Sequence, residues 1–211
     1  MTNATATAKK RRDPVATRAR ILDAARHLLA AGNGELEMSW VAKEAGVSQG
    51  LAYHHFGSKD GLLAAVVNDF YDRVEEAVLM AKLDDIADWE TRERTRSERY
   101  IRFLTHDPLG PLLATQLAQS PAVAAIEAER WSKLIEEGAR NIAEGQRRGV
   151  IVNPQRSDLL AAMVLGSIRS TVQRVLQTDQ SHEPAQLTEE IWRFLSPGLD
   201  IKQDKKAVKD D

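Results

Sequence analysis

Residues 48–59 carry polar side chains whose types and spacing suit contact with a nucleic acid. A glutamine near the start of a helix, here Gln49, can pair with the edge of an adenine through two hydrogen bonds. Gly50 has no side chain, so the backbone can approach a duplex closely there. Tyr53 and His54 carry donors for phosphate oxygens, which position a protein on DNA without specifying a sequence. These residues therefore favour DNA recognition.

A short helix over residues 49–56 has to position these side chains, and the flanking residues predict it. Ser48 can cap the helix by accepting a hydrogen bond from a backbone N–H two or three residues ahead. Gly46 suits the left-handed residue at which a preceding helix ends. Apolar residues at helical spacing give that preceding helix a buried face, at Val41, Ala42 and Ala45. The pattern is typical of a helix-turn-helix, whose second helix enters the major groove.

The polar residues that follow the second helix predict the start of a third. Ser58 can cap a helix that begins at Lys59, and Asp60 suits its positive first turn. Lys59 places a charge beside free backbone N–H groups, which predicts a phosphate anchor. Within the second helix we expect Leu51 and Phe56 to face inward.

The whole stretch resembles the N-terminal signature of the tetracycline-repressor (TetR) family of bacterial transcription regulators. The matching residues are Val41-Ala42, Ala45-Gly46-Val47-Ser48, Gly50, Tyr53-x-His55-Phe56, Ser58-Lys59 and Leu62. The motif match covers roughly residues 14–65, and beyond them the resemblance rests on helical pattern and chain length. It implies an all-α fold of about nine helices, in which an N-terminal three-helix DNA-binding domain precedes a larger ligand-binding and dimerisation domain.

Three residues depart from the family's usual pattern. Glu37 stands where the family usually has a capping threonine, so either Ser39 caps a shorter helix or Glu37 caps less well. We count Ser39 among the predicted DNA-binding residues. Trp40 either packs beneath the first helix of the chain, which is expected to begin at Pro14, or lies against the DNA backbone. Ala52 stands where leucine is usual, which leaves the packing of the second helix undecided.

The composition excludes several classes of protein. The 211 residues contain no cysteine, which rules out disulfides, thiolate metal sites and cysteine nucleophiles. No apolar run approaches the roughly 18 residues that cross a membrane, and no apolar segment follows the basic N-terminus to form a secretory signal. We expect a cytoplasmic bacterial protein, without membrane contact, that is nucleoid-associated when bound to DNA.

Catalytic and metal-binding motifs are missing from the sequence. It contains no Gly-x-Ser-x-Gly elbow, Gly-rich phosphate loop or His-Glu-x-x-His pair. His54 and His55 are adjacent, so on a helix they point about 100° apart and cannot easily share a tetrahedral metal ion. We predict no enzyme activity, no metal and no cofactor.

Positive charge is concentrated at the N-terminus. Residues 1–20 hold six lysines and arginines and one acidic residue, although the whole chain has a net charge of −2. A basic end on an acidic body suits a protein that binds DNA at one end. We expect residues 1–13 to be a disordered arm, whose cluster Lys9–Arg12 either follows the DNA or is a solubilising tail.

Helical patterns continue through the rest of the chain. The first helix is expected to begin at Pro14 and to end near residues 32–34. Later helices are expected over residues 59–82, 89–105, 112–119, 121–148, 157–177 and 184–195, with a break at the prolines of residues 108–111. The predicted domains are residues 14–58 for DNA binding and 59–199 for ligand binding and dimerisation, followed by a loose charged tail over 200–211.

The helix over residues 157–177 is apolar nearly all round in its first half, so we expect one face to meet the core and another a partner subunit. A helix-turn-helix monomer makes few base contacts, whereas a twofold dimer reads two half-sites about 34–36 Å apart. The resemblance likewise implies that the last two helices form the dimer interface. The predicted interface residues are Leu160, Val164, Ile168, Ile191 and Phe194.

The resemblance also implies that the helical body holds a small inducer. Six residues lie on helices that should converge, and we predict that they line the pocket: Tyr100, Phe103, His106, Gln116, Trp131 and Met163. Pockets combine apolar walls with a few polar groups, which favours a hydrophobic or amphipathic effector. The competing interpretation is that aromatic residues at helical spacing simply fill the core.

These features together predict a ligand-responsive transcriptional regulator, most simply a repressor. It would bind a palindromic operator on double-stranded DNA as a homodimer and leave the operator when the effector binds. The alternative is an architectural DNA-binding protein of the same fold that has no inducer.

Overall fold

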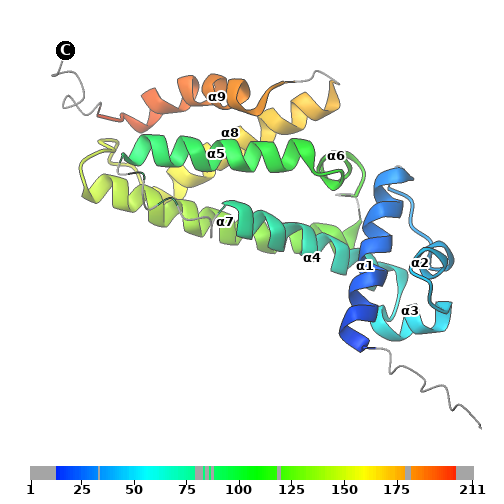
Figure 1. The fold of residues 1–211 in the computed structure, drawn as a ribbon. Helices are drawn as coiled ribbons and strands as arrows, with labels where there is room; N and C mark the ends of the chain where they lie inside the picture. Colours follow the sequence, from blue (N-terminus) through cyan, green and yellow to red (C-terminus); the bar gives the residue numbers. More distant parts are fainter. Residues whose placement is uncertain are drawn as a thin grey trace, which may run out of the picture. The chain divides into compact units, whose positions relative to one another are not determined.

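The computed structural model describes residues 13–32, 34–78, 83, 86, 88–117, 120–178 and 182–202. Within these ranges there are nine α-helices and no β-strand (Figure 1), which confirms the all-α fold class. The chain divides into two compact units, one up to Val66 and one from Val67 onward. The basic cluster Lys9–Arg12 and residues 203–211 lie outside the described residues.

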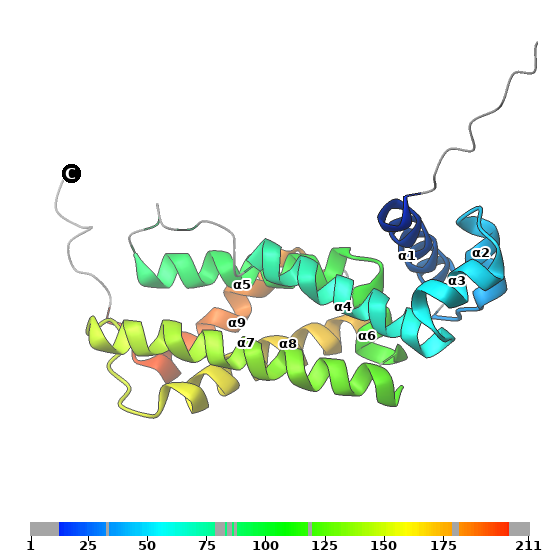
Figure 2. The ribbon, with the colours of Figure 1, turned by 90° about the horizontal axis from the view of Figure 1, so that it is seen from below.

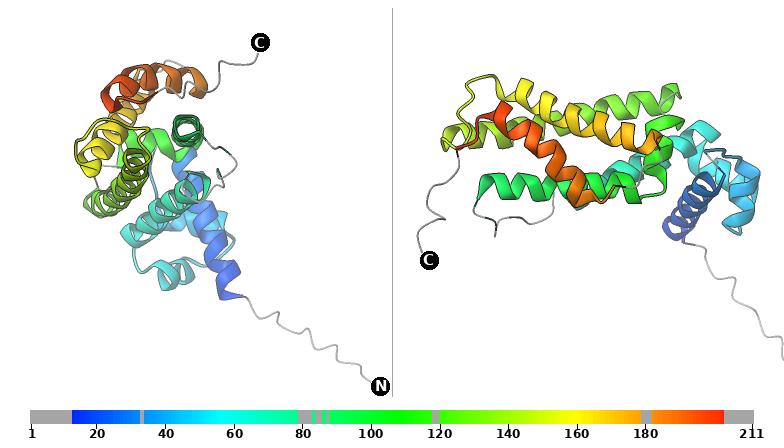
Figure 3. Two further views of the ribbon diagram at one scale, coloured as in Figure 1. Left: turned by 90° about the vertical axis from the view of Figure 1, so that its left-hand side faces the viewer. Right: turned by 90° about the horizontal axis from the view of Figure 1, so that it is seen from above.

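The N-terminal unit is built from three short helices and the beginning of a fourth. The three are α1 (Pro14–Ala31), α2 (Met38–Glu44) and α3 (Gln49–Phe56). Asp13 caps α1, because its side chain accepts a hydrogen bond from Val15 N at 2.9 Å. α1 packs on α2 and α3, and α2 packs on α3, as Figures 2 and 3 show from other sides.

The fourth helix, α4, extends over Lys59–Val78, and the division between the two units falls within it. Its buried residues recur at helical spacing, at Leu62, Val66, Val67, Phe70, Val74 and Val78. The helix was expected over residues 59–82, of which 79–82 lie outside the described residues.

The C-terminal unit is a bundle of long helices. These are α5 (Trp89–His106), α7 (Pro121–Arg147), α8 (Ser157–Gln177) and α9 (Pro184–Leu199), together with the short α6 (Leu109–Thr115). α7 packs along α8 and α5 packs along α9, while α5 and α8 also contact each other (Figures 1 and 3). α6 packs against α5 and α8.

The core of this unit is formed by large apolar side chains from the four long helices and the loop after α7. Its buried members are Trp89, Ile142, Ile151, Leu160, Ala161, Trp192 and Leu199. Gly145 of α7 makes room for two of them, because a Cβ there would lie 2.9 Å from Ile151 Cδ1 and 3.2 Å from Trp89 Cε2. The close contact between α7 and the core therefore depends on a glycine at this position.

The break between α5 and α6 is shorter than expected. α6 begins at Leu109 rather than at Leu112, and only Asp107 and Pro108 separate it from α5. Pro111 lies in the first turn of α6, where a missing N–H breaks no intrahelical hydrogen bond. Asp107 Oδ1 accepts a hydrogen bond from Leu109 N at 2.9 Å and so starts the turn.

The chain beyond α9 is attached to the body where a loose tail was expected. α9 itself continues to residue 199 instead of ending at 195. Val152 N then donates to Asp200 O at 3.1 Å, and Lys202 N donates to Val150 O at 2.9 Å. The expectation was therefore wrong for residues 200–202, which pair with the loop between α7 and α8.

One expectation from composition also needs correction, and it concerns α8. By length and composition this helix is able to cross a membrane, with a mean hydropathy of 1.3 over an 18-residue window. In the structure α8 packs against α5, α6, α7 and α9. Only 22% of the window is buried inside the protomer, which leaves apolar surface for another contact.

Candidate nucleic-acid interface and internal cavity

The segment from α2 to α3 has the geometry of a helix-turn-helix. Gly46 follows α2 with φ of 63°, a left-handed conformation that glycine adopts without strain. Ser48 caps α3, because its Oγ accepts a hydrogen bond from Leu51 N at 3.2 Å. The structure thus confirms the predicted residues 49–56 of the second helix.

The inner face of α3 depends on its smallest apolar residue. Ala52 is fully buried, whereas Leu51 and Phe56, which were expected to face inward, are only half-buried. The Phe56 ring is covered by the Arg18 guanidinium of α1, whose Cζ lies 5.0 Å from the ring centroid. Because the Ala52 side chain is small and fully buried, it allows α3 to approach α1 and α2 closely.

The outer face of α3 presents the residues that were predicted to bind DNA. Gln49, Gly50, Tyr53 and His54 are all exposed to solvent. Ser39, Ser48 and Lys59 are exposed as well. They lie before or after α3 in the sequence. The residues are thus available to a ligand, and their individual contacts with DNA stay predictions.

The start of α2 agrees with the second alternative that the sequence offered, in which Glu37 caps less well. The residue before the first turn is Glu37, whose side chain makes no capping hydrogen bond, and Ser39 lies inside the helix. Trp40 is 50% exposed, so part of its side chain is open to solvent. Its packing beneath α1 and its contact with the DNA backbone both stay predictions.

Glu37 has a different partner, which the sequence did not reveal. Its Oε1 lies 2.8 Å from Lys59 Nζ, and both side chains are about half exposed. Lys59, the predicted phosphate anchor, is therefore already paired with a carboxylate of its own unit. Ser58 caps α4 as expected, since its Oγ accepts from Gly61 N at 2.9 Å.

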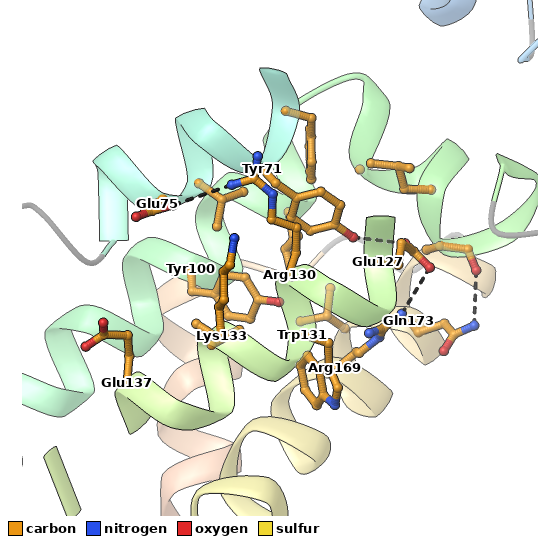
Figure 4. A pocket seen from close by; sticks show the side chains of 18 of the residues that line it. Tyr71, Glu75, Tyr100, Glu127, Arg130, Trp131, Lys133, Glu137, Arg169 and Gln173 are labelled. Atoms are coloured by element: carbon orange, nitrogen blue, oxygen red, sulfur yellow. Dashed lines mark hydrogen bonds and ion pairs between the residues drawn. The ribbon is translucent and has the colours of Figure 1, made fainter. Parts of the chain in front are cut away.

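A cavity of about 210 Å³, here called the outer cavity, lies inside the C-terminal unit among α4, α5, α6, α7 and α8. Its apolar walls are formed by Phe70, Val74, Tyr100, Leu104, Leu113, Leu134, Val172 and Leu176. Charged residues of both signs complete the lining (Figure 4), among them Glu75, Glu127, Arg130, Lys133, Glu137, Arg140 and Arg169. The cavity is therefore apolar with a charged border.

A hydrogen-bonded network centred on Glu127 crosses one side of the outer cavity (Figure 4). Tyr71 Oη donates to Glu127 Oε1 at 2.9 Å, and Arg169 Nη2 lies 3.4 Å from Glu127 Oε2. Arg169 also lies over the Trp131 ring, with Cζ 4.9 Å from its centroid. Burial and the Glu127 carboxylate raise the pKa of Tyr71 above its ordinary value, so the phenol remains a donor.

Arg130 connects the outer cavity to α4. From α7 its Nη2 donates to Asp72 Oδ1 at 2.6 Å and to Asn68 Oδ1 at 3.0 Å, and its Nη1 lies 3.5 Å from Glu75 Oε2. These three acceptors lie three or four residues apart, on one face of α4. A single guanidinium thus holds two turns of that helix.

The structure brings two of the six predicted pocket residues to the outer cavity. Tyr100 and Trp131 line it, while Phe103 packs its ring against Phe70 with centroids 5.3 Å apart. The other three predicted residues are exposed and do not line it: His106, Gln116 and Met163. Sequence reasoning missed the charged lining, although α7 signals it by charged residues at helical spacings of three and seven, at Glu127, Arg130, Glu137 and Arg140.

The predicted interface residues occupy two kinds of position. Leu160, Ile168 and Ile191 are buried within the protomer, and Val164 is half-buried. Phe194 of α9, by contrast, is 75% exposed. Two further apolar residues of α8 that the prediction did not name are also exposed, Leu159 and Met163.

Comparisons with known proteins agree with the helix-turn-helix geometry of the N-terminal unit. The family model described as bacterial regulatory proteins, tetR family, matches residues 21–66. A relative from Vibrio vulnificus (strain YJ016), nucleoid occlusion factor SlmA, is 28% identical over 194 residues, which cover 85% of this chain and 93% of the relative.

Solved structures share the fold. The fatty acid degradation regulator FadR from Bacillus halodurans has a TM-score of 0.75 at 21% identity, covering 92% of this chain and all of the other chain. The transcriptional regulator FadR from Bacillus subtilis, solved in complex with stearoyl-CoA, has a TM-score of 0.69 at 21% identity, covering 85% of this chain and 98% of that one. The exposed second helix lies in the matched N-terminal segment, residues 21–66, which belongs to the tetR family of bacterial regulatory proteins, and the protein is a DNA-binding transcription regulator.

Proposed function

We propose that the protein is a ligand-responsive repressor, which binds a palindromic operator as a homodimer and releases it when a small amphipathic effector occupies the outer cavity. The observation that carries this proposal is the outer cavity itself, an apolar space of about 210 Å³ with a charged border. A protein that acted only by covering DNA would have no need of such a space in its body.

The lining of the outer cavity supports an amphipathic effector. Its apolar walls suit the hydrocarbon part of an effector. Every cation that borders the cavity has a carboxylate partner, so an anionic group of the effector would bind a cation by displacing that carboxylate. These pairs are Arg130 with Asp72, Lys133 with Glu129, Arg140 with Glu137 and Arg169 with Glu127. The fold neighbour from Bacillus subtilis binds stearoyl-CoA, which is also an amphipath with an anionic part.

The exposed face of α3 supports the DNA-binding half of the proposal. We assign base contacts to Gln49, with Gly50 allowing close approach, and phosphate contacts to five flanking residues: Ser39, Ser48, Tyr53, His54 and Lys59. One short helix reads few bases, so specific binding needs two copies about 34–36 Å apart. Residues 14–58 would act as the DNA-binding domain and residues 59–199 as the ligand-binding and dimerisation domain.

Exposed apolar residues on α8 and α9 support self-association through these two helices. Leu159 and Met163 lie one turn apart on α8 and are 48% and 57% exposed, and Phe194 of α9 is 75% exposed. α8 packs against α9, so these residues belong to neighbouring elements. Exposed apolar side chains of this size on adjacent helices are typical of a protein–protein contact.

A second candidate function rests on the relative that spans most of the chain. It is named a nucleoid occlusion factor, and it matches 85% of this chain at 28% identity. The corresponding proposal is a nucleoid-associated protein that acts from many DNA sites without a small effector. An effector that releases DNA would separate the two candidates.

The deciding experiment is a fluorescence anisotropy titration at physiological salt with the duplex upstream of the protein's own gene and a scrambled duplex of equal length. Preference of about 10³ or more for its own upstream duplex is expected of a specific regulator. Straight-chain carboxylates and their CoA thioesters are then added to the complex. Specific binding that no amphipath reverses would overturn the repressor proposal and favour the second candidate.

A further inference from the structure

Tyr100 of α5 is a buried residue whose hydroxyl group makes no hydrogen bond with any residue that the structure describes. Its side chain lines the outer cavity and is 6% exposed. In Figure 4 it lies among the other lining side chains, and no dashed line ends on its oxygen. Tyr71 of the same cavity differs, because its Oη donates to Glu127 Oε1 at 2.9 Å. Buried donors are normally paired, so the Tyr100 hydroxyl needs a partner from outside the described residues.

The Tyr100 hydroxyl is open to a cavity and is not sealed within the core. Within the described ranges, two buried side-chain donors have neither a partner nor accessible surface, Arg96 Nε and Trp192 Nε1. Tyr100 Oη is not one of them, so this atom keeps accessible surface although it has no partner. Because the residue is almost fully buried and lines the outer cavity, that surface belongs to a cavity wall.

The charges that act on the hydroxyl place it on the side of the outer cavity. Tyr100 also lines a second cavity, of about 70 Å³, between α5, α7, α8 and α9. Burial raises the pKa of Tyr100, while the Arg169 guanidinium lowers it and the Glu127 carboxylate raises it. Both of these residues line the outer cavity and neither lines the second one. The phenol stays protonated at neutral pH, so it can donate a hydrogen bond into the outer cavity.

The carboxylates of the outer cavity are engaged with other groups. Glu127 accepts from Tyr71 through Oε1, and its Oε2 lies 3.4 Å from Arg169 Nη2. Glu75 Oε2 lies 3.5 Å from Arg130 Nη1. A cavity of about 210 Å³ has room for water, which can pair with the hydroxyl while no effector is bound. An effector that displaces this water must replace its hydrogen bond or lose affinity.

The surroundings of Tyr100 favour an acceptor atom without charge. The neighbouring wall of the outer cavity is apolar and includes Phe70, Leu104 and Leu134. Arg169 and Glu127 have opposite charges and pair with each other, so little net charge remains beside the hydroxyl. An anionic group would therefore be desolvated there without a cation of its own. A carbonyl, ester or ether oxygen accepts the same hydrogen bond without this cost.

We propose that Tyr100 determines the specificity of the outer cavity, and that its hydroxyl donates a hydrogen bond to an uncharged acceptor oxygen in the apolar part of the effector. This inference rests on the proposed function, in which the outer cavity holds the effector. It narrows the effector from any amphipath to one that carries a carbonyl, ester or ether oxygen besides its anionic end. A plain hydrocarbon chain would leave the hydroxyl unpaired.

The test measures the binding of two small uncharged probes to the full-length protein by ligand-observed NMR. Hexan-2-one carries an acceptor oxygen, and 2-methylhex-1-ene has the same shape with CH₂ in place of that oxygen. In Tyr100→Phe the affinity for hexan-2-one should fall about fivefold, because one neutral hydrogen bond is lost. The affinity for 2-methylhex-1-ene should stay unchanged, since the alkene accepts no hydrogen bond from the hydroxyl.

Tyr71→Phe is the matched control. It removes the same atom from the same cavity, but the Tyr71 hydroxyl already donates to Glu127. We therefore expect any effect of Tyr71→Phe to be equal for the two probes. A purely structural role of Tyr100 would likewise change both affinities by the same factor, so the comparison separates recognition from packing.

A second measurement uses the protein without substitution at position 100. The chain has three tyrosines, so Tyr53→Phe and Tyr71→Phe assign the ring signals of Tyr100 by elimination. With hexan-2-one bound, nuclear Overhauser effects to the Tyr100 ring should be stronger from the methyl group beside the carbonyl than from the methyl group at the far end of the chain. This result does not depend on whether Tyr100→Phe folds.

Three results would overturn the proposal. The first is an equal loss of affinity for both probes in Tyr100→Phe, and the second is a ketone-specific loss in Tyr71→Phe alone. The third is that hexan-2-one shows no saturable binding, or binds with the far end of its chain against the Tyr100 ring. The repressor proposal is tested separately, by release of operator DNA, so its failure is distinguishable from failure here.

Discussion

Lys59 Nζ lies 2.8 Å from Glu37 Oε1, so an ion pair joins the residue before α2 to the first residue of α4. Both side chains are about half exposed, and a pair of this kind contributes little to the free energy of unfolding. We infer that its effect is on DNA binding, because a phosphate would compete with the Glu37 carboxylate for the same ammonium group.

Replacement of Glu37 by glutamine should therefore tighten binding to any DNA, by about two- to fivefold at low salt. The amide removes the negative charge and leaves Lys59 available to a phosphate. Anisotropy titrations with the operator and with a scrambled duplex would measure the change. Glu35→Gln is the matched control, since it changes the net charge equally at an exposed position. Equal tightening in both variants would show that net charge, and not the pair, is responsible.

Gln49→Ala should reduce sequence preference, because a bidentate contact with a base contributes about 1–3 kcal/mol of discrimination. We expect the ratio of affinities for the operator and for a duplex altered at the contacted base to fall about tenfold. Lys59→Ala should weaken binding to both duplexes alike and reduce the salt slope by about one. Unchanged preference in Gln49→Ala would contradict the assignment of Gln49 to a base.

Phe194→Glu should shift the protein from dimer toward monomer, because a charge at an exposed apolar contact has to be desolvated on association. Sedimentation velocity over a range of protein concentrations would measure the shift. Val152→Glu is the control, since Val152 is also exposed but lies in the loop between α7 and α8. Dimerisation of equal strength in both variants would place the interface elsewhere.

Arg130→Met should weaken the response to an effector. The methionine keeps a long side chain but removes the hydrogen bonds to Asp72 and Asn68 of α4. It also removes the cation for which an anionic effector would compete with Asp72. The concentration of effector that releases half of the operator should therefore rise about tenfold. Arg140→Met is the control, because Arg140 also lines the outer cavity but pairs with Glu137 of its own helix. A similar loss in both variants would mean that charge at the border matters and the link to α4 does not.

The free energy of unfolding should fall as the pH rises above 10. Burial raises the pKa of Tyr100 to about 12, against an ordinary value of 10.0 in the unfolded chain. Between these values the unfolded chain loses the phenolic proton while the folded chain keeps it, so stability is full below pH 10 and declines toward pH 12. The loss is of the order of 2 kcal/mol, since one pKa unit corresponds to about 1.4 kcal/mol.

Urea denaturation at several pH values between 9 and 11.5 would measure this decline. Tyr100→Phe should reduce the decline but not abolish it, because it removes one of the two phenolic protons that the folded chain retains, the other being that of Tyr71, whose pKa is also raised. Tyr53→Phe should leave it in place, because Tyr53 is 43% exposed. A decline that is the same in both variants would assign the pH dependence to other groups.

The helix-turn-helix was predictable because its signals are local. The Ser48 cap, the glycine at position 46 and the apolar spacing of α2 act over a few residues, and the structure has the second helix at the residues predicted. The predicted break over residues 108–111 was too long, because Pro111 is tolerated in the first turn of α6. The start of that helix depends on the hydrogen bond to Asp107.

The site features that sequence reasoning missed depend on contacts between distant segments. Glu37, just before α2, and Lys59, the first residue of α4, are 22 residues apart, and Arg130 and Asp72 are 58 apart. Helical spacing tells which residues share a face, but it does not tell which neighbour that face meets. The aromatic residues were therefore assigned to a pocket of which only Tyr100 and Trp131 form part.

The pairing of residues 150–152 with residues 200–202 also bears on the order in which the chain folds. α7 and α8 are neighbours in sequence and can pack as a hairpin early, whereas the last pairing must close a loop of about fifty residues. Because α9 is held at its end by that loop closure, we expect its docking to be a late step. During synthesis the protein would thus hold an incomplete bundle, with the Trp192 side of its core open, until residues 200–202 leave the ribosome.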